Sequence, residues 1–170
     1  MADACKVWDT VMKKWFGTEH RRVTMAIGHA IVDKGAARGR TYILLGPPAT
    51  GKSTVLKLIG DIFGSEDDVV IAHDLDLTKL EEYREKYDLK DRILFGASNV
   101  EPPAGFEVKD CYIIHTQKKS RLMGQEEYKK VVNIMSRGIM DIRRHCAYTY
   151  VLADAAYAKM SEELRGKVKI

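Results

Sequence analysis

The sequence predicts an α/β protein with a mostly parallel β-sheet and helices on both of its faces. Short apolar runs rich in β-branched and aromatic residues occur at 41–45, 69–73, 92–98 and 111–115. The runs at 41–45 and 69–73 have the length and composition of buried strands, and those at 92–98 and 111–115 are predicted to be the third and fourth strands. Segments with helical spacing separate most of these runs, and the first run leads into a glycine-rich loop followed by a helix. Strands that alternate with helices favour parallel pairing.

Helices are also expected on either side of this strand-containing region. Apolar residues recur at helical spacing over 3–16 and 19–33, and again over 125–136 and about 139–165. Within the strand-containing region, the same spacing predicts helices at 52–63 and 78–87.

Several local features mark where these elements begin and end. Gly64 is the expected C-cap of the 52–63 helix, and Thr78 is the expected N-cap of the 78–87 helix. The segment GAARGR at 35–40 is predicted to be a basic turn. EPPAG at 101–105 is predicted to be a loop, because paired prolines cannot continue a helix or a strand.

The 170-residue chain has the length of a single domain. We expect it to contain three parts: a helical lead-in at 1–40, a P-loop core at 41–123 and C-terminal helices at 124–170 that pack on the core. The net charge of +4 permits contact with nucleic acid without requiring it.

Composition further narrows the class of protein. No apolar run approaches the roughly 18 residues of a membrane span, and the N-terminus has no signal-peptide pattern. Cys5, Cys111 and Cys146 lie far apart and form no CxxC pair. These features predict a reduced, cytoplasmic protein with no zinc site and no membrane partner.

The segment GPPATGKST matches the phosphate-binding pattern G-x-x-x-x-G-K-[ST] between a predicted strand and a predicted helix. Gly46 and Gly51 would let the backbone curl so that its N–H groups face a phosphate. Lys52 would bring its charge to the β- and γ-phosphates, and Ser53 would ligate Mg²⁺. The sequence therefore predicts a site for ATP and Mg²⁺, formed by Gly46, Pro47, Pro48, Ala49, Thr50, Gly51, Lys52, Ser53 and Thr54.

Such a site needs a carboxylate at the end of a neighbouring strand, to hold the magnesium shell or activate a nucleophile. VVIAHDLD supplies Asp74 and Asp76 just after an apolar strand. The carboxyl ends of parallel strands are where ligands of open α/β sheets bind. Both acids are candidate magnesium ligands, with Asp74 preferred as the catalytic acid. The alternative is that either one caps the next helix.

The third predicted strand ends in Ser98-Asn99. An amide at that position could orient an attacking water through hydrogen bonds. A turn-forming asparagine before Val-Glu-Pro-Pro is an equally good interpretation.

Three stretches resemble the superfamily 3 helicases, which are AAA+-related ATPases of viral and phage replication proteins. GPPATGKST looks like their Walker A loop, and VVIAHDLD is similar to their Walker B strand. ILFGASNVEPP resembles their motif C. The resemblance covers about residues 20–117 and implies a replication motor that hydrolyses ATP.

The resemblance also implies roles for particular residues and for partners. Lys52 and Ser53 become triphosphate and Mg²⁺ ligands, Asp74 and Asp76 the Walker B acids, and Asn99 the water-orienting sensor. Single-stranded nucleic acid becomes a partner, and the chain is expected to form a homo-oligomer, a hexameric ring. An arginine from the neighbouring subunit would complete the site, with Arg121 the first candidate and Arg137, Arg143 and Arg144 the alternatives.

The distance from the loop to HDLD also resembles a small P-loop kinase, in which a strand ending in D-x-D, here Asp74 and Asp76, binds the acceptor. In that alternative, Asp74 would bind or deprotonate an acceptor hydroxyl of a nucleoside or small alcohol, and Arg121 would lie in a lid. A third alternative is a nucleotide-dependent assembly or packaging module.

Aromatic residues outside these motifs have simpler interpretations. Trp8 and Trp15 lie seven residues apart on one predicted helix face, which indicates a core or interface position. Tyr148, Tyr150 and Tyr157 are expected to pack along the last helix. Stacking on single-stranded nucleic acid is the less favoured alternative.

Overall fold

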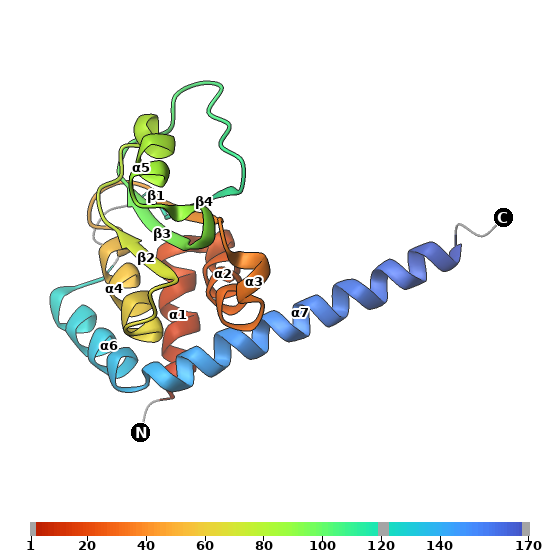
Figure 1. Cartoon of the computed structure of the whole chain (residues 1–170). Coiled ribbons are helices and arrows are strands. Elements are labelled where there is room, and N and C mark those ends of the chain that lie inside the picture. Colours follow the sequence, from red (N-terminus) through yellow and green to blue (C-terminus); the bar gives the residue numbers. More distant parts are fainter. Residues whose placement is uncertain (1–2, 119–122, 168–170) are drawn as a thin grey trace.

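The computed structural model describes residues 3–118 and 123–167, and the side chains among them up to residue 159. Its sheet has four strands in the order β2-β3-β1-β4, and every pairing is parallel. The strands are β1 (Thr41–Leu45), β2 (Val69–Ala72), β3 (Ile93–Ser98) and β4 (Cys111–His115). The predicted α/β class and parallel sheet are thus present (Figure 1).

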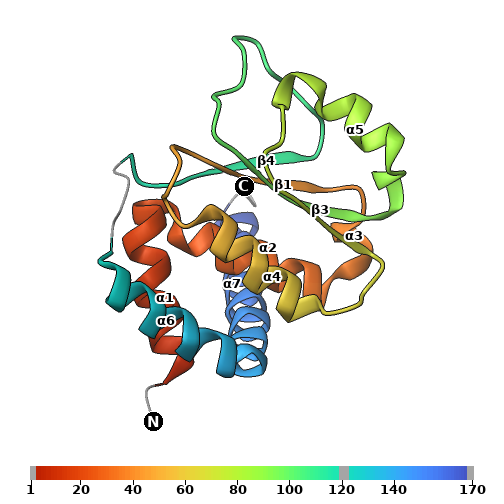
Figure 2. The same ribbon diagram turned by 90° about the vertical axis from the view of Figure 1, so that its left-hand side faces the viewer.

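The strand order explains why helices cover both faces of the sheet. The chain passes from β1 through α4 (Lys52–Phe63) to β2, two positions away, and then returns through α5 (Leu80–Lys86) to β3. Right-handed crossovers that run in opposite directions place their helices on opposite faces. Figure 2 shows α4 below the sheet and α5 above it.

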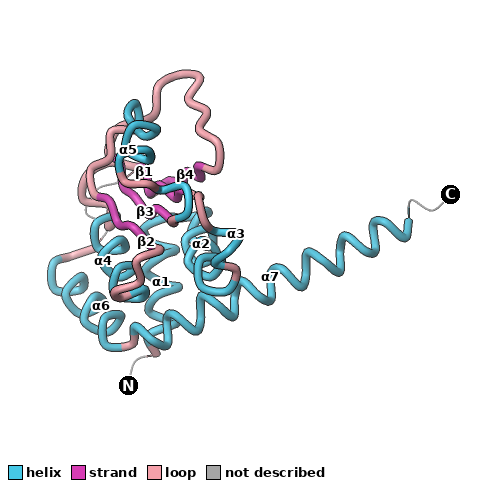
Figure 3. The backbone as a smooth tube through the Cα atoms, viewed as in Figure 1, coloured by secondary structure: helices cyan, strands magenta, loops and turns pink. Residues whose placement is uncertain are grey.

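The remaining helices lie on the α4 face, as Figure 3 shows. They are α1 (Ala4–Phe16), α2 (His20–Val32), the short α3 (Lys34–Ala37), α6 (Gln125–Arg137) and α7 (Ile139–Lys167). Three 3₁₀ turns complete the described elements, namely η1 (Gly17–Glu19), η2 (Leu77–Lys79) and η3 (Leu89–Asp91).

Strand β1 is buried along its whole length and divides the core into two layers. Tyr42 and Leu44 point into the larger layer, with the buried side chains of α1, α2 and α4. Ile43 and Leu45 point into the smaller layer, beneath α5. This alternation is the two-residue period of a strand that is buried on both faces.

The predicted strand and helix boundaries differ from the structure in few places. Thr78 does not cap the helix, because Asp76 caps η2 and α5 begins only at Leu80. The predicted basic turn at 35–40 instead contains the end of α3. Gly138 separates α6 from α7.

Only the first half of helix α7 packs on the core, whereas the sequence predicted that the C-terminal helices pack on it throughout. Ile142 and Cys146 are buried, but every side chain from 151 to 159 is exposed. The second half of the helix extends away from the remainder of the chain (Figure 1).

The contact between α2 and α7 depends on the absence of a side chain at Gly28. A Cβ atom built there would lie 2.6 Å from the Tyr150 Cβ and would also meet the Cys146 carbonyl oxygen on α7. Real Cβ atoms do not approach backbone this closely, so a side chain at residue 28 would push the two helices apart.

We expect Gly28→Ala to lower the free energy of unfolding by about 1–3 kcal/mol, the usual cost of overpacking. Chemical denaturation monitored by tryptophan fluorescence would measure the change. Gly35→Ala is the matched control, because a Cβ at that helical glycine meets nothing within 4 Å. Equal stability of Gly28→Ala and wild type would contradict the packing described for α2 and α7.

Candidate functional site

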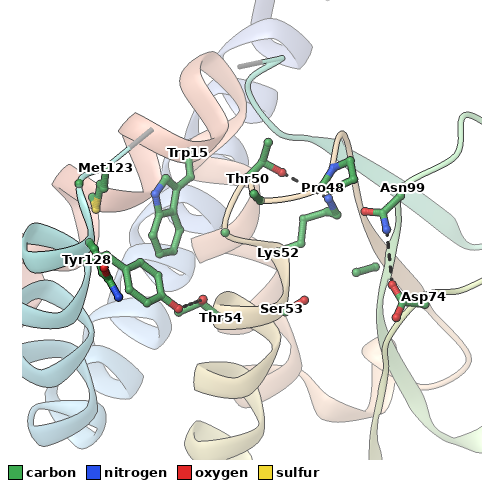
Figure 4. A pocket seen from close by; sticks show the side chains of 15 residues that line it. Trp15, Pro48, Thr50, Lys52, Ser53, Thr54, Asp74, Asn99, Met123 and Tyr128 are labelled. Carbon is green, nitrogen blue, oxygen red and sulfur yellow. Dashed lines mark hydrogen bonds between the residues drawn. The ribbon is translucent and has the colours of Figure 1, made fainter. Parts of the chain in front are cut away.

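A cavity of about 770 Å³ lies at the carboxyl end of the sheet, beside the loop between β1 and α4. Loop residues Pro48 to Thr54 line it, together with Asp74 after β2 and Asn99 after β3. Figure 4 shows these side chains with Trp15, Met123 and Tyr128 on the opposite wall. The cavity therefore brings the predicted loop residues from Pro48 to Thr54, Lys52 and Ser53 among them, together with Asp74 and Asn99.

Lys52 is the first residue of α4, and its side chain folds back into the loop. Its ammonium donates to the carbonyl oxygens of Gly46 at 2.7 Å and Pro47 at 2.6 Å. Thr50 Oγ1, itself bonded to Pro47, lies 3.3 Å from the same ammonium. Burial lowers the pKa of Lys52, and the nearby Asp74 carboxylate opposes this shift. Gly46 and Pro47 thus contribute carbonyl groups to Lys52 and do not line the cavity.

The loop conformation requires glycine at position 51. Gly51 has φ 89°, a backbone conformation that residues other than glycine rarely adopt. A Cβ there would also lie 2.5 Å from the indole ring of Trp15. Trp15 is buried, as predicted, but it also forms part of the cavity wall. No local sequence signal connects Trp15 to the loop, because the two lie 36 residues apart in the chain.

The N-terminus of α4 faces the cavity without a side-chain cap, because its N-cap residue is Gly51. The first turn of a helix has backbone N–H groups that lack intrahelical partners, and it carries a partial positive charge. Ser53 in this turn is exposed and lines the cavity. Thr54 is linked to α6 by a hydrogen bond of 2.6 Å between its hydroxyl and that of Tyr128. Tyr128 is a second wall residue that the sequence did not indicate.

Asp74 and Asn99 lie next to each other at the ends of neighbouring strands. Asn99 Nδ2 donates to Asp74 Oδ1 at 3.5 Å. Asp74 has φ 52°, and the next residue, Leu75, donates its backbone N–H to the Ala97 carbonyl at 2.8 Å. Aspartate adopts this left-handed conformation more readily than most residues other than glycine. The turn after β2 is therefore held against the end of β3, with the Asp74 carboxylate at the cavity.

Asp76 does not line the cavity. Its Oδ1 accepts hydrogen bonds from the backbone N–H of Thr78 at 3.0 Å and from the Thr78 hydroxyl at 2.6 Å. These bonds lower the pKa of Asp76. The capping alternative therefore describes Asp76, and we remove it from the candidate magnesium ligands.

None of the described arginines that were candidates to complete the site, Arg137, Arg143 and Arg144, lines this cavity. Arg121 lies outside the described residues. Arg143 belongs to the fold, because it donates to the Ile62 carbonyl at 2.7 Å and to Glu66 at 3.2 Å. Arg144 is exposed and pairs with Asp141 on its own helix, and Arg137 lines a separate cavity.

Among residues 3–118 and 123–159, no cluster of three or more His, Cys, Asp or Glu side chains could hold a metal ion by itself. At the cavity, Ser53 and Asp74 offer a hydroxyl and a carboxylate oxygen. Oxygen groups of this kind suit Mg²⁺, which keeps several waters and is held by few protein ligands together with phosphate oxygens. The side chains present therefore fit a magnesium ion that arrives with a phosphorylated ligand.

Comparison with protein-family models, curated proteins and solved structures finds no match to this chain. No helix in the described part of the chain has the length and apolar character needed to cross a membrane.

Two adjacent arginines on α7 provide a test of the role assigned to Arg143. We expect Arg143→Ala to lower the free energy of unfolding by about 1.5–3 kcal/mol, because it removes charged hydrogen bonds to the end of α4. Arg144→Ala should cost less than about 0.5 kcal/mol, since its ion pair is exposed. Equal effects of the two substitutions in urea denaturation would contradict this assignment.

Proposed function

We propose that this protein binds Mg-ATP and hydrolyses it as a P-loop ATPase. One observation carries the proposal. Lys52, Ser53, Asp74 and Asn99, which belong to three separate strand ends, line a single cavity at the carboxyl edge of a parallel sheet. The uncapped N-terminus of α4 and its lysine supply positive charge at the same place, which is the arrangement that a polyphosphate requires.

In this proposal each side chain has a distinct task. Lys52 exchanges its bonds to the Gly46 and Pro47 carbonyls for oxygens of the β- and γ-phosphates. The backbone N–H groups of the loop and of the first turn of α4 bind the β-phosphate. The γ-phosphate would lie beside Asp74 and Asn99. Asn99 would orient the attacking water, and Asp74 would accept a hydrogen bond from that water.

Ser53 and Asp74 would hold the magnesium ion, Ser53 through its hydroxyl and Asp74 directly or through water. When bound, the ion would offset negative charge on the phosphate oxygens.

The geometry favours a hydrolase over the kinase alternative. The Asn99 amide lies 3.5 Å from the Asp74 carboxylate, and both side chains line the cavity. In the kinase alternative, Asp74 and Asp76 would face an acceptor together. Instead, the Asp76 carboxylate is engaged by Thr78 and does not line the cavity.

Coupling of hydrolysis to nucleic-acid work and assembly into a ring, as the superfamily 3 resemblance implies, are further parts of this proposal. The basic net charge is compatible with a nucleic-acid partner. If a ring forms, the arginine that completes the site would be one other than Arg143, because Arg143 donates to the Ile62 carbonyl of its own subunit.

We expect Lys52→Ala to abolish ATP hydrolysis while the protein remains folded, because it removes the charge that the cavity provides for the phosphates. Lys57→Ala is the matched control, since Lys57 is exposed on the same helix and lies outside the cavity. Phosphate release and circular dichroism would be measured for both. Normal turnover by Lys52→Ala would overturn the proposed function.

Asn99→Ala should lower the rate of phosphate release on the order of 10²-fold, the usual effect of losing one positioned hydrogen-bond donor. Binding of a fluorescent ATP analogue should change little, since the loop and Lys52 remain intact. Transfer of labelled phosphate to a nucleoside or small alcohol, unaffected by Asn99→Ala, would instead support the kinase alternative.

A further inference from the structure

A second cavity, of about 400 Å³, lies between α2, the edge strand β4 and α7. It shares no lining residue with the cavity at the loop. Its walls are unusually rich in rings and guanidinium groups, and the residues that matter for the argument are Arg22, His29, Arg40, Tyr42, Tyr112 and Tyr150.

One wall is the end of an aromatic column that crosses the sheet. Phe63 of α4 stacks on Phe95 of β3 at 6.0 Å between ring centroids, and Phe95 stacks on Tyr42 of β1 at 5.1 Å. Tyr42 then stacks on Tyr112 of β4 at 5.5 Å. The column follows from the register, in which Phe95 and Tyr112 both lie opposite Tyr42. It ends at the sheet edge on Tyr112, whose surface is 40% exposed.

The facing wall is a second pair of stacked rings, His29 of α2 and Tyr150 of α7, with 5.2 Å between centroids. His29 Nδ1 lies 2.8 Å from the Tyr42 hydroxyl, so a hydrogen bond joins the two walls. Burial and the nearby Arg40 lower the pKa of His29, and burial raises the pKa of Tyr42 to about 12. Both rings are therefore uncharged at neutral pH, and the two aromatic pairs form the facing walls of a slot.

Positive charge lies at the rim of this slot. The Arg40 guanidinium carbon lies 5.4 Å from the centre of the Tyr112 ring. Arg22 also lines the cavity and is largely exposed, and its Nη1 lies 3.4 Å from Glu19 Oε2 one turn earlier. Among the lining residues the only carboxylate is that of Asp33, which accepts a hydrogen bond from the Ala36 backbone. Two guanidinium groups beside one or two carboxylates are suited to a ligand with a single negative charge.

The slot is not suited to the addition of another β-strand. Two outward-facing backbone groups of β4 already form hydrogen bonds with side chains, one of Glu19 just before α2 and one of Arg22 in α2. The His115 N–H donates to Glu19 Oε2 at 2.8 Å, and Arg22 Nη1 donates to the Ile113 carbonyl at 3.5 Å. A peptide strand would have to displace both contacts.

We propose that this cavity binds one nucleotide unit of a single-stranded nucleic acid. Its base extends the aromatic column on Tyr112, and its phosphodiester lies near Arg22 and Arg40. Every base offers a π-face for stacking on an aromatic ring, and guanidinium groups bind phosphate oxygens. Binding at this cavity does not depend on the proposed ATPase, because the two cavities share no residue.

The test is a titration of a fluorescein-labelled oligo(dT) of about 12 nucleotides, followed by anisotropy at low salt without ATP. Tyr112→Ala should weaken binding by about 5- to 100-fold, the cost of one lost base stack. Tyr112→Phe, which keeps the ring, should bind within about threefold of wild type. Tyr157→Ala is the control for an exposed tyrosine elsewhere, and it should have no effect.

A second variant covers the case in which Tyr112→Ala perturbs the sheet edge. Arg22→Gln should weaken binding and reduce the slope of log Kd against log salt by about 0.7, the value for one phosphate contact on a single strand. Lys52→Ala should bind the oligonucleotide like wild type, so failure of the proposed ATPase would leave this result unchanged.

Three results would overturn the proposal. They are wild-type affinity in folded Tyr112→Ala, an equal loss in Tyr112→Phe and Tyr112→Ala, and no measurable binding of the oligonucleotide to the wild-type protein at low salt.

Discussion

The pairing of β1 with β3 is the constraint on which the rest of the structure depends. Five residue pairs, from Thr41 with Leu94 to Leu45 with Ser98, align the carboxyl ends of the two strands. The loop that begins at Gly46 and the polar pair that follows β3 must therefore start side by side. The Gly46 N–H donates to the Ser98 carbonyl at 3.2 Å and joins them directly. Because β2 pairs with the far side of β3, Asp74 arrives next to Asn99.

The same pairing makes the candidate site a product of the whole chain. The lead-in helices contribute Trp15, which packs against Gly51, and the C-terminal helices contribute Tyr128, which bonds to Thr54. These contacts also explain why the three predicted parts of the chain share one large core. A loop that is packed on both sides in this way needs less ordering if a ligand binds to it.

The two cavities are connected by the core of the protein. Helix α4 begins at Lys52 in the first cavity and ends at Phe63, where the aromatic column starts. That column runs through β3 and β1 to Tyr112 at the second cavity. Arg143 lies over the Phe63 ring at 5.5 Å and holds the end of α4 to α7. The residues between the proposed ATP site and the proposed nucleic-acid site are therefore packed without a break.

The sequence by itself determined the local structure. Strands 41–45 and 111–115 and the helix at 52–63 have the predicted bounds, because runs of β-branched and aromatic residues favour strands and Gly64 ends the helix. Burial does not follow in the same way, since only Ile114 of the edge strand 111–115 is buried. It also indicated Lys52, Ser53, Asp74 and Asn99, whose spacing relative to strand ends is a local property. The prediction of Thr78 as a cap is wrong, because the helical turn η2 already begins at Leu77 and the Thr78 hydroxyl donates to Asp76, the N-cap of that turn. The tertiary structure alone decided the strand order, the separation of Asp74 from Asp76, the positions of Trp15 and Tyr128, and the aromatic column. Each of these depends on contacts between residues far apart in the chain, and no spacing within a single segment records such contacts.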